Sequence, residues 1–110
     1  MADRIGQPFG VEAEEADGAL RLRFSGELDY AAAAEARAAL ETACARGGRI
    51  EVDLDEITFL DSSGLRELVT ARRAADRDGC SLVVVAVSER ARQVLDLTGT
   101  YNWLSDGAQA

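Results

Sequence analysis

The chain has 110 residues, a formal net charge of −8 at pH 7 and a hydrophobic content of 47%. This length and hydrophobicity predict a single globular domain over residues 1–110 and exclude a disordered chain. The negative charge argues against direct binding to nucleic acid or to an anionic membrane surface. No apolar run reaches the roughly 18 residues of a membrane span, and Met1–Arg4 lacks the basic start of a signal peptide. The expected location is the cytoplasm.

The chain contains neither histidine nor lysine, so its basic residues are all arginines. The lack of histidine excludes Ser-His-Asp and Cys-His catalysis and the usual imidazole metal site. The lack of lysine excludes Schiff-base chemistry and a phosphate-loop lysine. Cys44 and Cys80 each stand alone in an apolar stretch, which is typical of small core residues. The sequence therefore predicts no enzyme, no cofactor and no metal site.

The N-terminal part predicts two strands joined by a tight turn. Residues 1–8 are expected to form a loose lead-in, and residues 9–15 a weak edge strand. Asp17-Gly18 is typical of a hairpin turn. Alternation of apolar and polar residues over 19–24 then predicts a half-buried strand. Residues 25–29 are expected to break this strand and to lead into a loop.

The middle of the chain predicts a helix, a central strand and a second helix. Residues 30–46 are alanine-rich without internal Gly or Pro, which favours a helix, and Gly47-Gly48 ends it. Residues 49–54 alternate again and predict a strand. After an apolar run over 57–60, a helix is expected to about Asp78. The residues expected to be buried are Ala33, Ala36, Leu40, Ala43 and Cys44 on the first helix, Ile50, Val52 and Leu54 on the strand, and Gly64, Leu65, Leu68, Ala71 and Ala75 on the second helix.

The last part predicts a strand, a helix and a short final strand. Residues 81–87 are continuously apolar, which is typical of a strand covered on both faces. Ser88 is a good N-cap for a helix over 89–97. Residues 101–104 are expected to form a last strand, followed by a tail over 105–110. The predicted order β-β-α-β-α-β-α-β indicates an α/β domain with a mixed sheet packed against helices.

The stretch Asp61-Ser62-Ser63-Gly64 places hydroxyl groups at the start of a helix, where backbone N–H groups lack partners. Ser62, Arg66, Val69 and Arg73 follow one stripe along that helix at i, i+4, i+7 and i+11. We interpret Ser62 as the position where a phosphate is added and removed. The alternative is that Ser62 or Asp61 is only an N-cap and the arginines form a solvated face.

Two further acidic positions have alternative interpretations. Asp29 either caps the alanine-rich helix or contributes to an interface. Asp53-Leu54-Asp55 resembles the Asp-x-Asp motif of phosphatases, but that chemistry needs a lysine or another cation near the acyl phosphate, and an arginine does not easily replace a tuned lysine.

Four segments resemble the STAS domain, and the closest group is the bacterial anti-sigma factor antagonists. They are Ser25-Gly26-Glu27-Leu28-Asp29, Ile50-Glu51-Val52-Asp53-Leu54, Phe59-Leu60-Asp61-Ser62-Ser63-Gly64-Leu65 and Val94-Leu95-Asp96-Leu97-Thr98-Gly99. The resemblance runs from about Phe9 to Leu104 and implies the mixed sheet and helices of that fold. The six residues after Leu104 leave no room for the family's usual final helix, so a short or missing one is expected.

The resemblance implies a switch with two states. The unphosphorylated domain would bind an anti-sigma factor, usually a serine kinase, and release a sigma factor. Phosphorylation at Ser62 would end that binding, and a serine phosphatase would reset it. The implied partner-binding residues are Gly26, Asp29, Asp61, Ser62, Ser63, Gly64, Arg66, Val69 and Arg73.

Three other functions remain open at this point. The first is a solo STAS subunit of a lipid-transport ABC complex or of a stress-signalling assembly. The second is an enzyme of the Asp-x-Asp type, and the third is a domain that binds a small ligand or nucleotide directly.

Overall fold

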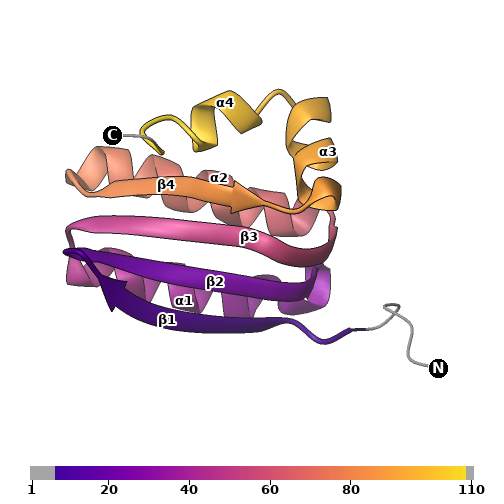
Figure 1. Ribbon diagram of the computed structural model, residues 1–110, viewed down its shortest axis with the longest axis horizontal. Coiled ribbons are helices and arrows are strands. Elements are labelled where there is room, and N and C mark those ends of the chain that lie inside the picture. Colours follow the sequence, from indigo (N-terminus) through magenta and orange to yellow (C-terminus); the bar gives the residue numbers. More distant parts are fainter. Residues whose placement is uncertain (1–6, 109–110) are drawn as a thin grey trace.

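The computed structural model describes residues 7–108 as a four-stranded mixed sheet, β1-β2-β3-β4, with α1 and α2 behind it (Figure 1). Helix α4 lies along the outer edge of β4, and α3 lies near the carboxyl end of that strand. The predicted α/β class with a mixed sheet is confirmed. The elements are β1 Gly10–Ala16, β2 Ala19–Leu28, the 3-10 helix η1 Tyr30–Ala32, α1 Ala33–Arg46, β3 Arg49–Leu60, α2 Ser62–Asp78, β4 Ser81–Val87, α3 Glu89–Leu97 and α4 Tyr101–Leu104.

The strand directions bring three helix starts to one end of the sheet. β1 and β2 form the predicted hairpin, in which Asp17 and Gly18 both have positive φ angles, of 54° and 81°. Two positive φ angles suit the twist of a two-residue hairpin turn. β2, β3 and β4 are parallel. Their carboxyl ends therefore meet at one end of the sheet, where η1, α2 and α3 begin (Figure 1).

The expected break at residues 25–29 is wrong, because β2 continues to Leu28. Its pairing with β3 shifts twice, between Arg23 and Ser25 and between Gly26 and Glu27, and β3 supplies the extra residue each time. Bulges of this kind let a strand continue while its direction changes. The predicted central strand likewise extends past residue 54, as far as Leu60.

The end of the expected lead-in lies against β2, whereas residues 1–6 lie outside the described part. The backbone N–H of Glu27 donates a hydrogen bond to the carbonyl of Gln7 at 3.2 Å. Gly26 has a φ angle of 79°, and a Cβ there would collide with the carbonyl oxygen of Pro8. Gly26 therefore permits both the strained backbone and the close approach of the two segments.

The expected last strand over residues 101–104 is wrong, because these residues form the single-turn helix α4. Aromatic residues favour strands, but tertiary contacts decide here. The guanidinium of Arg72 donates to the carbonyl oxygens of Trp103 and Leu104 at 2.7 and 3.3 Å. The hydroxyl of Ser105 donates to the carbonyl of Tyr101 at 2.7 Å. α4 is the last helix among residues 7–108, and the described residues after Leu104 form turns.

The main core lies between the sheet and the two helices behind it. The strand residues expected to face inward, Ile50, Val52 and Leu54, are fully buried. Each buried side chain of this size contributes roughly 1.5–3 kcal/mol. The helix faces agree with the prediction, with three exceptions: Cys44 and Leu65 are half-buried instead of buried, and the charged Glu67 is buried. The core residues that complete this layer are Leu22, Phe24, Ala36, Leu40, Ala43, Leu68, Ala71, Ala75, Leu82 and Val84.

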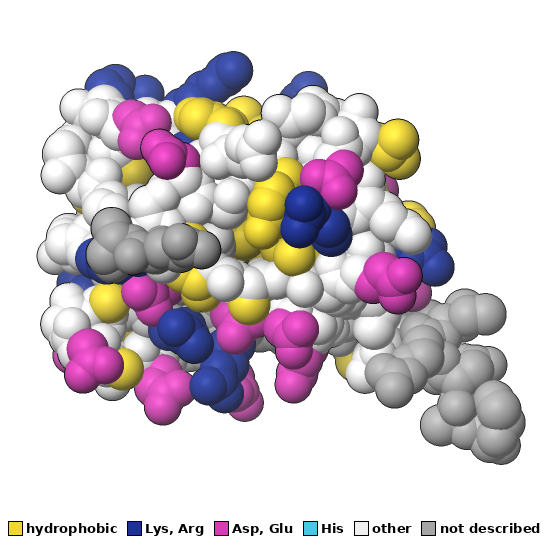
Figure 2. All heavy atoms as spheres, turned by 45° about the horizontal axis from the view of Figure 1, so that its top comes forward, with side chains coloured by type: hydrophobic (Ala, Val, Ile, Leu, Met, Phe, Trp, Pro, Cys, Tyr) yellow, Lys and Arg dark blue, Asp and Glu magenta, His cyan; other side chains and the backbone are white. Residues whose placement is uncertain are grey.

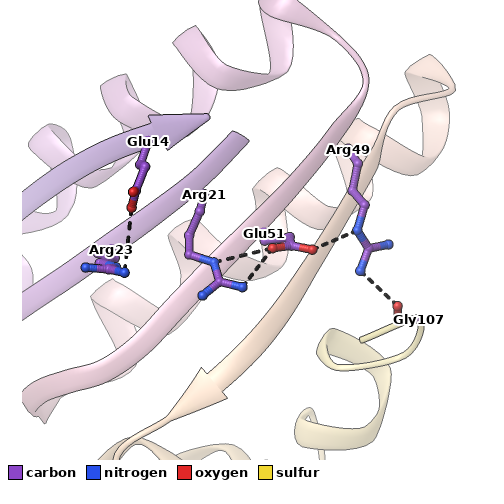
Figure 3. A network of polar contacts seen from close by, with 6 residues as sticks. All are labelled: Glu14, Arg21, Arg23, Arg49, Glu51 and Gly107. Carbon is purple, nitrogen blue, oxygen red and sulfur yellow. Dashed lines mark hydrogen bonds and ion pairs between the residues drawn. The ribbon is translucent and has the colours of Figure 1, made fainter. Parts of the chain in front are cut away.

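The opposite face of the sheet carries a ladder of charges (Figure 3). The carboxylate of Glu51 accepts hydrogen bonds from Arg21 at 3.0 Å and from Arg49 at 3.0 Å. These bonds, led by that from Arg49, hold the pKa of Glu51 below its ordinary value. Acidic and basic side chains are interspersed in the space-filling view (Figure 2). The pairing of charges across this face indicates a solvated surface.

The sheet edge formed by β1 is acidic. β1 pairs with β2 on one side only, and its side chains from Glu12 to Ala16 are exposed. Glu14 pairs with Arg23 at 3.6 Å, and Glu15 pairs with Arg46 at 3.0 Å.

We predict that Arg72→Ala detaches α4 and lowers the free energy of unfolding by about 1.5–3 kcal/mol, because two carbonyls lose a charged donor. The guanidinium also lies 5.4 Å from the ring centroid of Trp103, which is the chain's single tryptophan. Urea unfolding followed by tryptophan fluorescence measures both effects, and the emission should move to longer wavelength. Arg73→Ala is the matched control, and equal behaviour of the two variants would contradict the prediction.

Candidate functional site

Asp61 joins the ends of two strands at the carboxyl end of the sheet. Its carboxylate accepts a hydrogen bond from the N–H of Gly64 at 3.0 Å, which caps α2, and another from the N–H of Tyr30 at 3.2 Å. The N–H of Asp61 donates to the carbonyl of Leu28 at 3.3 Å. One residue therefore holds the start of α2 against the segment that follows β2.

Gly64 allows α2 to begin this close to β2. A Cβ at this position would lie 2.7 Å from Cγ of Leu28 and would collide with the carbonyl oxygen of Leu28. An alanine normally stabilises a helix relative to glycine by about 1 kcal/mol. Here the clash with backbone outweighs that gain, because the start of α2 would have to move away from β2.

Asp29 also acts as a cap. Its carboxylate accepts a hydrogen bond from the N–H of Ala32 at 3.1 Å and so starts η1. This is the capping role considered from the sequence, although the cap belongs to a 3-10 turn before α1. A role of Asp29 at an interface stays a prediction.

The two serines differ from Asp61 in having no capping role. Ser62 is the first residue of α2 and is exposed, whereas Ser63 is half-buried. Among residues 7–108, the structure shows no hydrogen bond for either hydroxyl. The N–H of Gly64, which a capping residue would bind, is bound by Asp61. The capping alternative therefore applies to Asp61 and leaves the hydroxyl of Ser62 open to solvent.

A hollow of about 290 Å³ lies beside the serines, between the start of α1 and the first turns of α2. A water molecule takes about 30 Å³ in the liquid, so this serine hollow has room for a group of several heavy atoms. Three residues predicted from the sequence line it, namely Ser62, Ser63 and Arg66. The other lining residues are Tyr30, Ala33, Arg37 and Glu67.

An ion pair between α1 and α2 forms one wall of the serine hollow. The Nε and Nη2 atoms of Arg37 donate to the two carboxylate oxygens of Glu67 at 3.0 and 2.9 Å. The side chain of Glu67 is only 6% exposed. The hydrogen bond from Arg37 is the main cause that lowers the pKa of Glu67, and the charge of Arg66 adds to it against the effect of burial. Glu67 therefore stays ionised and orients Arg37.

The predicted stripe along α2 carries arginines without an ion-pair partner. Arg66 and Arg73 are exposed and Val69 is half-buried. Eight of the described arginines form ion pairs. Within residues 7–108, no ion pair or hydrogen bond is shown for Arg66, Arg73 or Arg90. Two of these three therefore lie on the stripe that begins at Ser62.

The structure brings most, but not all, of the predicted site residues together. Asp61 and Gly64 position the serine hollow, whereas Val69 and Arg73 lie further along α2. Gly26 is buried against Pro8, away from the residues that line the hollow.

Sequence reasoning missed three residues of the hollow, Tyr30, Arg37 and Glu67. Tyr30 follows Asp29 directly, and Arg37 lies seven residues later on the same helical side. That spacing could have indicated that Tyr30 and Arg37 lie on the same side of the helical segment. The pairing of Arg37 with Glu67 across two helices was not visible in the sequence.

The other candidate sites show structural contacts. The carboxylate of Asp53 accepts a hydrogen bond from the N–H of Asp55 at 2.9 Å. No cluster of three metal-binding side chains occurs within the described range. Cys44 and Cys80, distant in the sequence, are neighbouring thiols that form no disulfide. Burial, followed by the effect of Cys80, raises the pKa of Cys44 to about 11.

Comparison with known proteins identifies the family. The model of the STAS domain matches residues 10–106. The chain belongs to the STAS domain family. Its relatives include the anti-sigma-B factor antagonist of Bacillus subtilis, 26% identical over 91 residues that cover 83% of this chain and 84% of the relative. The anti-sigma F factor antagonist of Paenibacillus polymyxa is 29% identical over 93 residues, which cover 83% and 80%.

Solved structures of anti-sigma factor antagonists share the fold. An anti-sigma factor antagonist from Mycobacterium paratuberculosis matches with a TM-score of 0.80 and 25% identity, over 90% of this chain and 84% of that one. The antagonist SpoIIAA in its unphosphorylated form matches with a TM-score of 0.70 and 26% identity, over 87% and 84%. The phosphorylated form of SpoIIAA from Bacillus matches with a TM-score of 0.66 and 26% identity, over 87% of both chains. Across the described residues of this STAS domain, no helix has the length and apolar character to cross a membrane.

We predict that Arg37→Met lowers the melting temperature at pH 7, because a buried carboxylate loses its partner. The pKa of Glu67 lies below its ordinary value of 4.5 in the native protein, so the pair contributes stability above that pH and loses it as pH falls through the lowered pKa. In the variant, burial raises the pKa of Glu67. The difference in melting temperature should therefore narrow from pH 7 towards pH 4 in calorimetry.

Arg46→Met is the matched control for this measurement. Its partner Glu15 is 70% exposed, so the loss should be small and nearly independent of pH. A gap between wild type and Arg37→Met that stays constant or widens on acidification would contradict the assignment.

Proposed function

We propose that this STAS domain is an anti-sigma factor antagonist that is switched by phosphorylation at Ser62. In its unphosphorylated form it binds an anti-sigma factor that is also a serine kinase, and a sigma factor is released. The kinase then phosphorylates Ser62 and the complex separates, and a serine phosphatase restores the first state. In this cycle the chain is a ligand and a kinase substrate, not an enzyme.

The observation that carries the proposal is the uncommitted hydroxyl of Ser62. It is exposed at the first position of α2, while Asp61 makes the capping bond. A kinase can reach such a hydroxyl without breaking a hydrogen bond of the fold. The relatives named as anti-sigma factor antagonists support the choice of partner.

A phosphate at Ser62 adds about −1.5 to −2 charges. The start of a helix tolerates this charge, because unpaired N–H groups and the helix dipole favour an anion. The similarity of this fold to both forms of SpoIIAA supports a switch that leaves the fold intact. The phosphate would therefore act at the interface, through the cost of desolvation and through repulsion near Asp61 and Asp29.

The proposed partner surface includes residues beyond the sequence prediction. In the described part of the chain, the exposed large hydrophobic side chains are Tyr30, Phe59 and Leu97. Tyr30 is 82% exposed and lines the serine hollow. Tyrosine is enriched among the residues that dominate binding energy in protein interfaces. Tyr30 therefore joins the predicted residues Asp29, Ser62, Ser63, Arg66, Val69 and Arg73 on this surface.

We predict that Ser62→Ala binds the cognate anti-sigma factor constitutively and that Ser62→Asp binds weakly. A penalty of about 3–4 kcal/mol at the interface corresponds to a loss of affinity of several hundredfold. Titration calorimetry with the purified anti-sigma factor kinase measures it, and Ser81→Asp, at an exposed serine that starts β4 outside the partner surface, is the control. The melting temperature should change by less than roughly 8 °C on phosphorylation.

Equal affinities of Ser62→Ala and Ser62→Asp would refute the switch. Failure of any kinase to label Ser62, together with stable co-purification of transporter subunits, would instead favour a subunit of a lipid-transport complex. Phosphatase activity that is lost in Asp53→Asn would favour an enzyme. Calorimetric binding of a nucleotide would favour a ligand-binding domain.

We predict that Tyr30→Ala weakens binding of the anti-sigma factor about 30-fold, as expected for an exposed aromatic anchor. The fold should be unaffected, because the side chain is exposed. Leu97→Ala is the matched control, because Leu97 is 87% exposed on α3 and does not line the serine hollow. Surface plasmon resonance on the immobilised kinase measures both. Equal losses in the two variants would remove Tyr30 from the partner surface.

A further inference from the structure

We propose that a phosphate on Ser62 is held by the chain's own arginines, with Arg66 as the main ligand and the outer edge of Arg37 as the second. The serine hollow would then be an intramolecular phosphate-binding site that is filled only in the phosphorylated state. This inference rests on the proposed phosphorylation of Ser62 and adds to it where the phosphate goes.

Arg66 is placed to reach that phosphate. It lies four residues after Ser62, so the two side chains share one face of α2. Side chains on a helix point towards its N-terminus, which directs the Arg66 guanidinium back towards Ser62. Within residues 7–108, the structure shows no ion pair or hydrogen bond for Arg66, whereas eight other arginines are paired. Binding a phosphate would therefore break no existing contact of Arg66.

Arg37 enters the hollow from the other helix. Its Nε and Nη2 atoms donate to Glu67, and no hydrogen bond is shown for its Nη1 atom among the described residues. The buried carboxylate of Glu67 thus fixes the plane of the guanidinium and leaves one edge available. A fixed guanidinium with an open edge suits a phosphate oxygen, because little side-chain freedom remains to be lost on binding.

The charged groups around the hollow leave the cation of Arg66 without a partner among the described residues. Glu67 is neutralised by Arg37. The two oxygens of Asp61 accept hydrogen bonds from the N–H groups of Gly64 and Tyr30. The remaining groups are the phenol of Tyr30 and the unpaired cation of Arg66. A phosphate at the start of α2 would meet the cation of Arg66 and the N-terminal helix dipole, which act against the negative charge of Asp61.

The arrangement adds a second effect to the switch. In the unphosphorylated state, Arg66 is an exposed cation on the proposed partner surface. In the phosphorylated state it would be engaged by the phosphate and unavailable to a partner. Phosphorylation would thus remove an attractive group from the interface as well as add a repulsive one.

The test places phosphoserine at position 62 by genetic encoding, so that no cognate kinase is needed. The second ionisation of a phosphoserine lies near pH 6, and ³¹P NMR between pH 4.5 and 8 measures it. Arg66 stabilises the dianion, so Arg66→Gln should raise the phosphate pKa by about 0.3–0.7 unit. Arg73→Gln, a matched exposed arginine outside the hollow, should leave it unchanged.

A second arm tests Arg37 without leaving a buried charge. In the double variant Arg37→Gln, Glu67→Gln, the phosphate pKa should rise by less than in Arg66→Gln, and circular dichroism checks that both variants remain folded. Identical titrations of the wild type, Arg66→Gln and Arg73→Gln would overturn the inference. Its failure is separable from that of the proposed function, because binding of the phosphoserine protein to the anti-sigma factor kinase is measured independently.

Discussion

The carboxylate of Asp61 is the contact on which the arrangement of the site depends. It caps α2 through Gly64 and holds the backbone of Tyr30, so that two segments 31 residues apart are fixed to each other. Gly64 makes this possible because any larger residue would push α2 away from the end of β2. Since Asp61 satisfies the helix terminus, the neighbouring Ser62 keeps its hydroxyl for another use. Asp61 therefore holds the structure together, while the adjacent Ser62 keeps a hydroxyl that can be modified.

The arginines divide in a similar way: some are bound to other groups of the fold, and others have no partner among the described residues. On the open face of the sheet, Arg21 and Arg49 are committed to Glu51, and Arg72 is committed to the end of α4. Arg37 is partly committed, because Glu67 occupies one edge of its guanidinium. Arg66 and Arg73 have no recorded partner among the described residues. In a chain with a net charge of −8, two of the three described arginines without a shown partner lie on the helical face that begins at Ser62, and the third is Arg90.

The sequence was sufficient for the elements with strong local signals. The helix that follows Ser88, Glu89–Leu97, and the strand Ser81–Val87 have their predicted bounds, because a cap and a continuous apolar run define them locally. The predictions for residues 25–29 and 101–104 were wrong, because bulges in β3 and the side chain of Arg72 decide the structure of these segments. Asp61, Ser62, Ser63 and Arg66 are local in sequence and were predicted. Arg37 and Glu67 meet only through the packing of α1 on α2, which no local pattern encodes.

The acidic edge strand β1 affects whether two copies of this domain can pair through their sheets. An exposed strand edge can add a strand from a neighbouring molecule and so begin aggregation. If two copies met through β1, the exposed Glu12 and Glu14, which share one face of the strand, would approach those of the other copy, and Glu14 has only the 3.6 Å ion pair with Arg23 to offset its charge. Like charges opposite each other destabilise a strand pair. The glutamates of β1 therefore oppose the growth of a continuous intermolecular sheet through this open edge.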